Sequence, residues 1–102
     1  MPAITVVIPT LAADDSLAQC LESLRRQTFR DFEIVVVDNS GARRVPGAPD
    51  VRVLHSAVNR GYGGAVNDAV RCTQSEFVAV LNDDTAAEVK WLERLVDAAG
   101  RA

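Results

Sequence analysis

The sequence is poor in aromatic residues, cysteines and long apolar runs, and each shortage excludes a class of protein. Aromatic residues make up 5% of the 102 residues and the net charge is −3, so the chain lacks both the stacking surface and the positive charge that nucleic acids require. No segment reaches the roughly 20 apolar residues that span a bilayer. The first residues show no basic stretch followed by an apolar one. We therefore expect a cytoplasmic protein with no nucleic-acid partner, no leader peptide and no integral membrane segment.

The two cysteines, Cys20 and Cys72, lie far apart in the chain. They lack the paired spacing that binds zinc or forms a redox motif. Each falls on the apolar face of a predicted helix, so we expect both to be reduced thiols in the core.

Size and composition are those of one small globular domain covering residues 1–102. Hydrophobic residues make up 48% of the chain and charged residues 25%, which is typical of a folded protein with a single core.

Strand-like and helix-like patterns alternate along the chain. The predicted strands are Ile4–Ile8, Phe32–Asp38, Val51 to Leu54 or His55, and Phe77–Leu81, and apolar spacings of three and four predict helices over residues 17–27, 65–73 and 89–99. Gly61, Gly63 and Gly64 predict a turn before the second helix. This order predicts an α/β fold, a Rossmann-like three-layer αβα sandwich with a mostly parallel sheet.

Polar residues follow three of the predicted strands. They are Pro9-Thr10, Asp38-Asn39-Ser40 and Asn82-Asp83-Asp84. Ligands of parallel sheets bind beyond the carboxyl ends of the strands, so these segments are expected to converge on one edge and form a site.

The adjacent carboxylates of Asp83 and Asp84 directly follow an apolar strand. Carboxylates are costly to bury unless a cation or a specific partner satisfies them, so the pair suggests an Mg²⁺ or Mn²⁺ site. The alternative is a solvated loop with an Asx turn or a helix cap.

Five segments, in the same order, resemble the amino-terminal, nucleotide-sugar-binding half of a family-2 glycosyltransferase of the GT-A fold. They are Val6–Thr10, Cys20–Thr28, Glu33–Ser40, Asn59–Asn67 and Leu81–Thr85. Together they cover nearly the whole chain, and their combination is far more specific than any one of them.

The resemblance implies inverting, metal-assisted transfer of a sugar from a nucleoside-diphosphate sugar to an acceptor hydroxyl. Asp84 would hold the cation first and Asp83 second, with Asn82 at the first position of an Asp-x-Asp-like motif. The Mg²⁺ or Mn²⁺ would neutralise the charge that develops on the leaving diphosphate. Relatives often have proline where Asp83 stands, which leaves its contact with the metal open.

The resemblance also implies a donor pocket for a UDP-sugar or dTDP-sugar. Pro9 and Thr10 would line it, and Asp38 would accept a hydrogen bond from the imide N–H of uracil or thymine, which cytosine lacks. Asn39 belongs to the same set of donor-binding residues. The alternative for Asp38 is a turn residue paired with Ser40.

The glycine-rich segment 59–64 has two interpretations. Gly61 could contact the diphosphate through backbone N–H groups at a helix start, or the glycines could allow close packing of the helix. The spacing of the glycines is not that of a dinucleotide-binding fingerprint.

No residue is assigned as the general base, because the resemblance places that base well beyond the acidic motif. The chain is therefore expected to be a donor-binding half, truncated before its catalytic complement, and working peripherally at the membrane. A non-catalytic binding or assembly module that keeps the fold is the alternative. A nucleotidyltransferase is disfavoured because Asp14 and Asp15 follow the first strand, where that class needs a basic, glycine-rich loop.

The resemblance implies a sheet that continues past this point, so the predicted strand Phe77–Leu81 would lose a neighbour and expose an apolar edge. Exposed edges of this kind pair readily with other chains. We expect a homo-oligomer that covers it.

Overall fold

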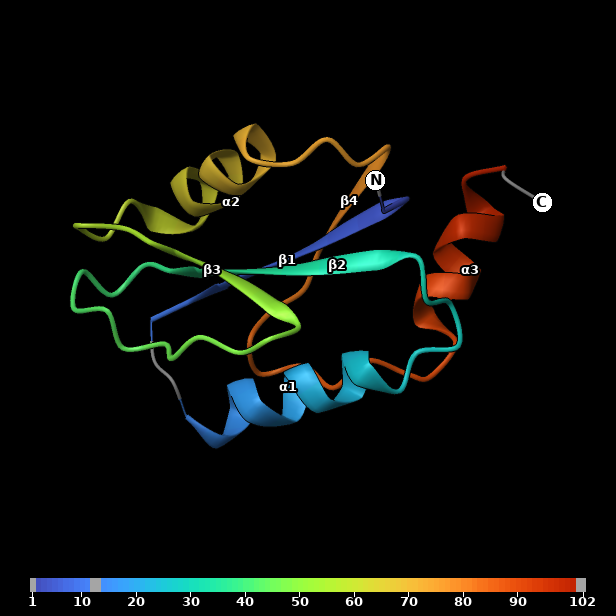
Figure 1. Ribbon diagram of the computed structural model, residues 1–102, viewed down its shortest axis with the longest axis horizontal. Helices are drawn as coiled ribbons and strands as arrows, with labels where there is room; N and C mark the ends of the chain where they lie inside the picture. The colour runs from blue at the N-terminus through green and yellow to red at the C-terminus, as the bar shows by residue number, and fades with distance from the viewer. Residues whose placement is uncertain (1, 12–13, 101–102) are drawn as a thin grey trace.

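The computed structural model describes residues 2–11 and 14–100; residues 12 and 13, part of the predicted loop after the first strand, lie outside the described residues. The strands are β1 (Ile4–Thr10), β2 (Phe32–Asp38), β3 (Val51–His55) and β4 (Phe77–Val80), and the helices are α1 (Asp15–Arg25), α2 (Gly61–Arg71) and α3 (Trp91–Ala98). Figure 1 shows their arrangement.

The four strands form one sheet of order β3-β2-β1-β4, in which every pair is parallel. Helix α2 packs on one face, and α1 and α3 pack on the other (Figure 1). The predicted α/β, Rossmann-like sandwich is confirmed. In this register Thr10 pairs with Asp38, and Asp38 pairs with His55, so the carboxyl ends of three strands lie at one edge of the sheet.

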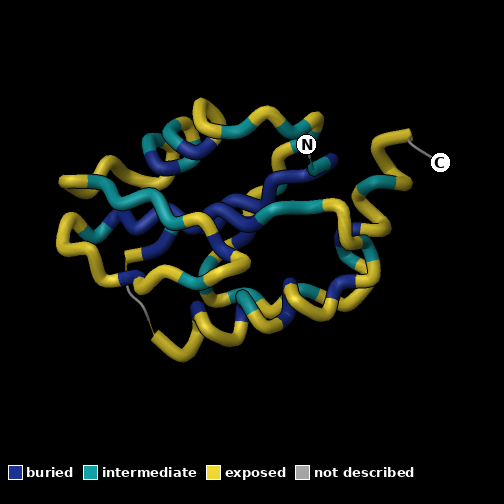
Figure 2. Tube along the Cα trace, in the orientation of Figure 1, coloured by how far each residue is buried: buried dark blue, intermediate teal, exposed yellow. Residues whose placement is uncertain are grey.

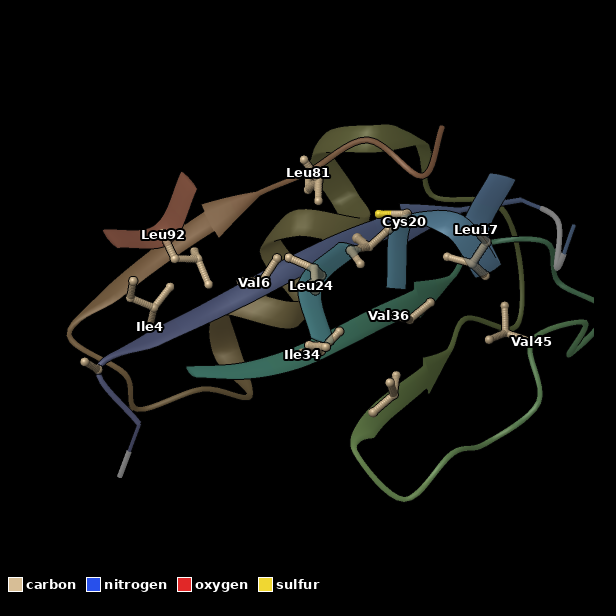
Figure 3. Packing of buried hydrophobic residues seen from close by; sticks show 13 residues of the cluster. Ile4, Val6, Leu17, Cys20, Leu24, Ile34, Val36, Val45, Leu81 and Leu92 are labelled. Carbon is tan, nitrogen blue, oxygen red and sulfur yellow. The ribbon is translucent and has the colours of Figure 1, made fainter. Parts of the chain in front are cut away.

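The core follows from alternation along the two central strands, which form the most buried part of the chain (Figure 2). Val6 of β1 faces α1, where Leu24 is fully buried (Figure 3). Ile8 belongs to the same buried cluster. Val7 faces the opposite way and packs against Ala65 of α2. Burying one such leucine or valine contributes roughly 1.5–3 kcal/mol, so both faces of the sheet stabilise the fold.

Helix α1 begins as the sequence indicates and ends earlier. The Asp14 carboxylate accepts a hydrogen bond from the backbone N–H of Leu17 at 3.1 Å, which is an N-cap. The helix ends at Arg25 instead of Gln27, because Arg26 adopts a capping conformation with φ −97° and ψ 4°. Gln27 is thereby released from the helix and is buried against other segments.

The predicted turn before the second helix is wrong, because the glycines form the first turn of α2 itself. The side chain of Asn59 accepts a hydrogen bond from the backbone N–H of Gly61 at 2.8 Å. Gly61 has φ +72°, a left-handed conformation that glycine adopts readily. The helix ends at Arg71, two residues before the predicted end at Thr73.

Helix α3 is shorter than predicted and begins at Trp91. Val89, expected on its apolar face, precedes it and is 44% exposed. Leu92 is fully buried and anchors the helix, while Gly100 follows the helix with φ +79°.

The two cysteines differ in burial, and neither forms a disulfide. Cys20 is buried as predicted, but Cys72 is exposed, so its predicted place in the core is wrong. Cys72 is the C-cap of α2 and lies outside the helix face through which Ala65 and Ala69 pack on the sheet.

Strand β4 is an edge of the sheet in the described part of the chain, and Val78 and Val80 are partly exposed on it. None of the described helices combines the length and apolar character needed to cross a bilayer. The expected cytoplasmic location stays a prediction.

Candidate functional site

A cleft of about 420 Å³ opens at the carboxyl ends of β1, β2 and β4. It brings together residues from four separate segments of the chain. They are Pro9, Thr10, Leu11, Asn39, Asn59, Gly61, Tyr62, Asn82, Asp83 and Asp84. The predicted convergence of distant segments at this edge is confirmed, and of the donor-binding and metal-binding residues expected there only Asp38 is absent from the lining.

Two hydrogen bonds join the acidic loop, defined as residues Asn82–Asp84, to the rest of the cleft. The buried Thr10 hydroxyl donates to Asp83 Oδ2 at 2.7 Å, which ties the end of β1 to the loop. From α2, the Tyr62 hydroxyl donates to Asn82 Oδ1 at 3.4 Å. Asp83 is half-buried and Asp84 is exposed, so the Asp84 carboxylate is the more accessible of the two.

Asp38 lies beneath this edge with 1% of its surface exposed. Its Oδ1 accepts hydrogen bonds from the Ser40 backbone N–H at 3.1 Å and the Ser40 hydroxyl at 2.6 Å. Its Oδ2 accepts from the Val45 backbone N–H at 2.9 Å and from His55 Nδ1 at 3.1 Å. Four donors fill the acceptor sites of the carboxylate.

Burial acts to raise the pKa of Asp38, but the hydrogen bonds from Ser40, Val45 and His55 outweigh it and lower the pKa to about 2. Asp38 is therefore ionised at neutral pH and held by the protein itself. Both oxygens are occupied and the side chain does not line the cleft, which argues against the contact between Asp38 and a pyrimidine base; that contact stays a prediction. The alternative interpretation, a turn residue paired with Ser40, describes the observed geometry.

Asn39 connects the end of β2 to the turn before α2. Its Nδ2 donates to Asn59 Oδ1 at 3.0 Å and to the Gly61 carbonyl at 3.1 Å. Its Oδ1 accepts from the Arg60 backbone N–H at 2.9 Å. Asn39 is 4% exposed, so it forms part of the cleft wall and fixes Gly61 beside it.

The oxygen atoms of the acidic loop are of the kind that hard cations bind. Two carboxylates and the Asn82 amide supply oxygen ligands, which Mg²⁺ and Mn²⁺ prefer. Over residues 2–11 and 14–100, no three acidic, histidine or cysteine side chains gather into a closed cage. Mg²⁺ is commonly held by one or two carboxylates together with substrate phosphates, so a pair such as Asp83 and Asp84 could be the protein's share of such a site.

Cys20 lies directly below the acidic loop and acts there as a neutral donor. Burial raises the pKa of its thiol to about 11, with further contributions from Asp83 and Asp84. The thiol donates a weak hydrogen bond to the Asn82 carbonyl at 3.7 Å. Cys20 is fully buried and does not line the cleft, so the side chains that the acidic loop presents there carry oxygen atoms.

Four residues of this region were not singled out from the sequence: Leu11, Asn59, Tyr62 and His55. The first three line the cleft, and Asn59 and Tyr62 belong to the glycine-rich segment whose role was left open. His55 and Asp38 end neighbouring parallel strands in direct register, so the strand pattern was the available signal for their contact.

The chain has detectable similarity to known proteins over almost its entire length. The model of the family described as Glycosyl transferase family 2 matches residues 5–102. Succinoglycan biosynthesis protein ExoO of Rhizobium meliloti is 30% identical, in an alignment that covers 100% of this chain and 31% of ExoO. This chain therefore spans about a third of the length of that relative.

Two solved structures share the fold. The 1–349 fragment of S. aureus TarS, in complex with UDP-GlcNAc, has a TM-score of 0.73 and 26% identity, and the match covers 95% of this chain and 30% of that one. The mannosyltransferase PcManGT from Pyrobaculum calidifontis, in complex with GDP-Man and Mn²⁺, has a TM-score of 0.68 and 23% identity, and covers 81% of this chain and 28% of that one.

Proposed function

This chain belongs to glycosyl transferase family 2, and we propose that it forms the part of such an enzyme that binds the nucleotide-sugar donor. The observation that carries this proposal is the meeting of Thr10, Gly61 and the acidic loop in one cleft at the carboxyl edge of a parallel sheet. Ligands of open α/β sheets bind at this edge. The enzyme would transfer the sugar, with inversion, to an acceptor hydroxyl.

The donor is proposed to be a UDP-sugar or a dTDP-sugar. The similarity to TarS, whose structure holds UDP-GlcNAc, supports a uridine nucleotide. Pro9 and Thr10, which line the cleft, would contact its nucleoside. Because the Asp38 carboxylate is already satisfied, the choice of base would depend on cleft-lining groups such as Asn59 instead.

A divalent cation, Mg²⁺ or Mn²⁺, is proposed to bind at Asp84, with Asp83 as a second ligand. When bound, it would supply Lewis-acid neutralisation of the diphosphate. One oxygen of Asp83 is engaged by Thr10, whereas Asp84 is exposed to the cleft. We therefore assign the dominant contribution to Asp84. No residue of this chain is assigned as the general base, since carboxylates that hold a cation are poor proton acceptors.

Titration calorimetry tests this proposal with UDP, dTDP and GDP, each with and without Mn²⁺. We expect Mn²⁺ to strengthen the binding of UDP or dTDP, and Asp84→Asn to abolish most of that gain. Losing a metal-binding group or its support typically costs about 10–100-fold in affinity. Asp97→Asn, at an exposed position of α3, is the matched control and should bind as the wild type does.

A non-catalytic binding or assembly module remains the second candidate. It is supported by the hydrogen bonds that Asp38 and Asn39 accept from backbone N–H groups of the protein itself. If none of the three nucleotides binds more tightly with Mn²⁺, the donor-binding proposal is wrong and the module is favoured.

We further propose that the β4 edge is covered in solution by a homo-oligomer. Val78 and Val80 are 38% and 37% exposed on this strand, and unprotected edges promote pairing. Sedimentation equilibrium at high protein concentration would show a dimer or larger assembly; a monomer throughout would contradict it.

A further inference from the structure

Residues 81–90 carry the acidic loop and contain no helix or strand, so contacts with other segments determine their path. Leu81 continues the ladder beyond β4 by donating its backbone N–H to the Val7 carbonyl at 2.9 Å. A turn follows, in which the Thr85 N–H donates to the Asn82 carbonyl at 3.1 Å. The Asp84 side chain forms no hydrogen bond within the described part of the chain, so its position follows from the backbone alone.

Two buried polar side chains form hydrogen bonds with the segment that follows the acidic loop. Ser23 lies in the last turn of α1, and Gln27 lies just after the helix. The Ser23 hydroxyl accepts the backbone N–H of Ala87 at 2.9 Å. The Gln27 amide donates to the Glu88 carbonyl at 2.7 Å and accepts the Leu92 N–H at 3.0 Å. We call Ser23 and Gln27 the α1 brace.

The α1 brace has one residue in α1 and one just after it, both beside the apolar face of the helix. Ser23 and Gln27 are 6% and 2% exposed, beside the fully buried Cys20 and Leu24. A buried polar group costs free energy unless it is hydrogen-bonded, and every buried side-chain nitrogen and oxygen in the described residues has a partner. An apolar side chain would pack at these positions without that requirement, so the polar atoms are explained by the backbone groups they hold.

Gln27 also completes the start of α3. The first N–H groups of a helix have no partner within it, and the N-cap residue Lys90 supplies no side-chain hydrogen bond. Gln27 supplies one from outside the helix, at Leu92. One side chain thus links the end of α1, the segment after the acidic loop and the first turn of α3.

We propose that Ser23 and Gln27 are positioning residues for the acidic loop: by fixing residues 87–92, they hold Asp84 toward the cleft and thereby set the affinity of the metal–nucleotide complex. This inference rests on the proposed function for its ligand. Outer groups that orient metal ligands typically contribute about 10–100-fold to metal affinity.

The test compares Gln27→Met with Gln19→Met. Both remove a glutamine amide while keeping side-chain length, but Gln19 lies within α1 and is exposed, whereas Gln27 follows α1 and is buried. In Gln27→Met we expect the Mn²⁺-dependent gain in UDP affinity to fall about tenfold, with UDP affinity in the absence of metal unchanged. Gln19→Met should match the wild type in both. Ser23→Ala removes the acceptor of the Ala87 N–H and the donor to the Cys20 carbonyl, and provides a second variant if Gln27→Met does not fold.

Amide hydrogen exchange in the absence of ligand gives the second readout. Loss of the α1 brace should speed exchange at Leu92 and also at Thr85, the reporter of the acidic loop, while amides of α2 keep wild-type rates. Faster exchange at Leu92 alone, with Thr85 and the Mn²⁺ effect unchanged, would overturn the inference and leave the brace a local support of α3.

If wild-type protein shows no Mn²⁺-dependent nucleotide binding, the proposed function fails. The exchange rate at Thr85 then decides the inference by itself: acceleration in Gln27→Met keeps the positioning of the loop, and a wild-type rate refutes it.

Discussion

The substitution Asp38→Asn distinguishes two roles of this carboxylate: stabilising the fold and binding a nucleotide base. The pKa of Asp38 is lowered from 3.8 to about 2 in the folded protein, because four hydrogen bonds outweigh the opposing effect of burial. At about 1.4 kcal/mol per pKa unit, this corresponds to about 2 kcal/mol of stability. The asparagine side chain would keep one oxygen and turn an NH₂ group toward a backbone or imidazole donor.

The pH dependence has a fixed sign. Because the pKa of Asp38 is lower in the folded than in the unfolded state, its contribution is complete above about pH 4 and is lost as the pH falls toward 2. We therefore expect Asp38→Asn to lower the free energy of unfolding by about 2 kcal/mol at pH 7, and the gap from the wild type to shrink below about pH 4.

Urea unfolding followed by circular dichroism between pH 7 and pH 3 measures this gap, with Asp97→Asn as the exposed control. In parallel, UDP affinity with Mn²⁺ is measured at pH 7, where the variant is folded, and is expected to match the wild type. The reasoning is refuted if Asp38→Asn is as stable as the control and loses UDP binding, since Asp38 would then contact the ligand directly.

Two further predictions concern the core and the thiols. Leu24→Ala should lower the free energy of unfolding by about 2–5 kcal/mol, because it leaves a cavity under the sheet. Val89→Ala, at a position 44% exposed, should change the free energy of unfolding by less than about 0.5 kcal/mol. Equal effects of the two substitutions in urea unfolding would contradict the assigned packing. At pH 8, a thiol reagent should modify Cys72 in the folded protein and Cys20 only after unfolding, because burial raises the pKa of Cys20 to about 11. Rapid labelling of both thiols in the native state would show that Cys20 is not buried between α1 and the sheet.

The fold could be predicted because its signals are local and repeated. The run Val6-Val7-Ile8 is buried on both faces, as an apolar strand of a parallel sheet must be. The polar residues after the strands then had to meet at one edge, which placed Thr10 near Asp83 before any contact was known. The place of the cleft followed from the same rules.

The sequence could not decide between the two interpretations of Asp38, because the choice depends on how residues 40–45 fold back. That loop brings the Val45 N–H to the carboxylate, and β3 brings His55 to it from 17 residues away. The Val45 contact leaves no periodic pattern in the sequence, and the strand pattern that pairs Asp38 with His55 does not show which way their side chains point. A strand-end aspartate looks the same whether it faces a ligand or is enclosed by its own loop.

Helix ends were missed for a related reason. Gln27 continues the helical spacing of α1, but its amide forms hydrogen bonds with the backbone of Glu88 and Leu92, far along the chain. The glycines after Asn59 indicate a turn locally, but the Asn59 side chain stabilises Gly61 at the start of a helix. A side-chain hydrogen bond to the backbone decided the conformation in both places, long-range at Gln27 and between near neighbours at Asn59.

The most direct test of the donor-binding cleft is paramagnetic broadening by Mn²⁺ of the amide NMR signals of the isotope-labelled protein in the presence of UDP. We expect the strongest broadening at Asp83 and Asp84, weaker broadening at Thr10 and Gly61 across the cleft, and none at Ser75 near the amino end of the sheet. Broadening centred at Ser75, or uniform weak broadening with no focus at the acidic loop, would contradict the assignment of this cleft as the metal–nucleotide site.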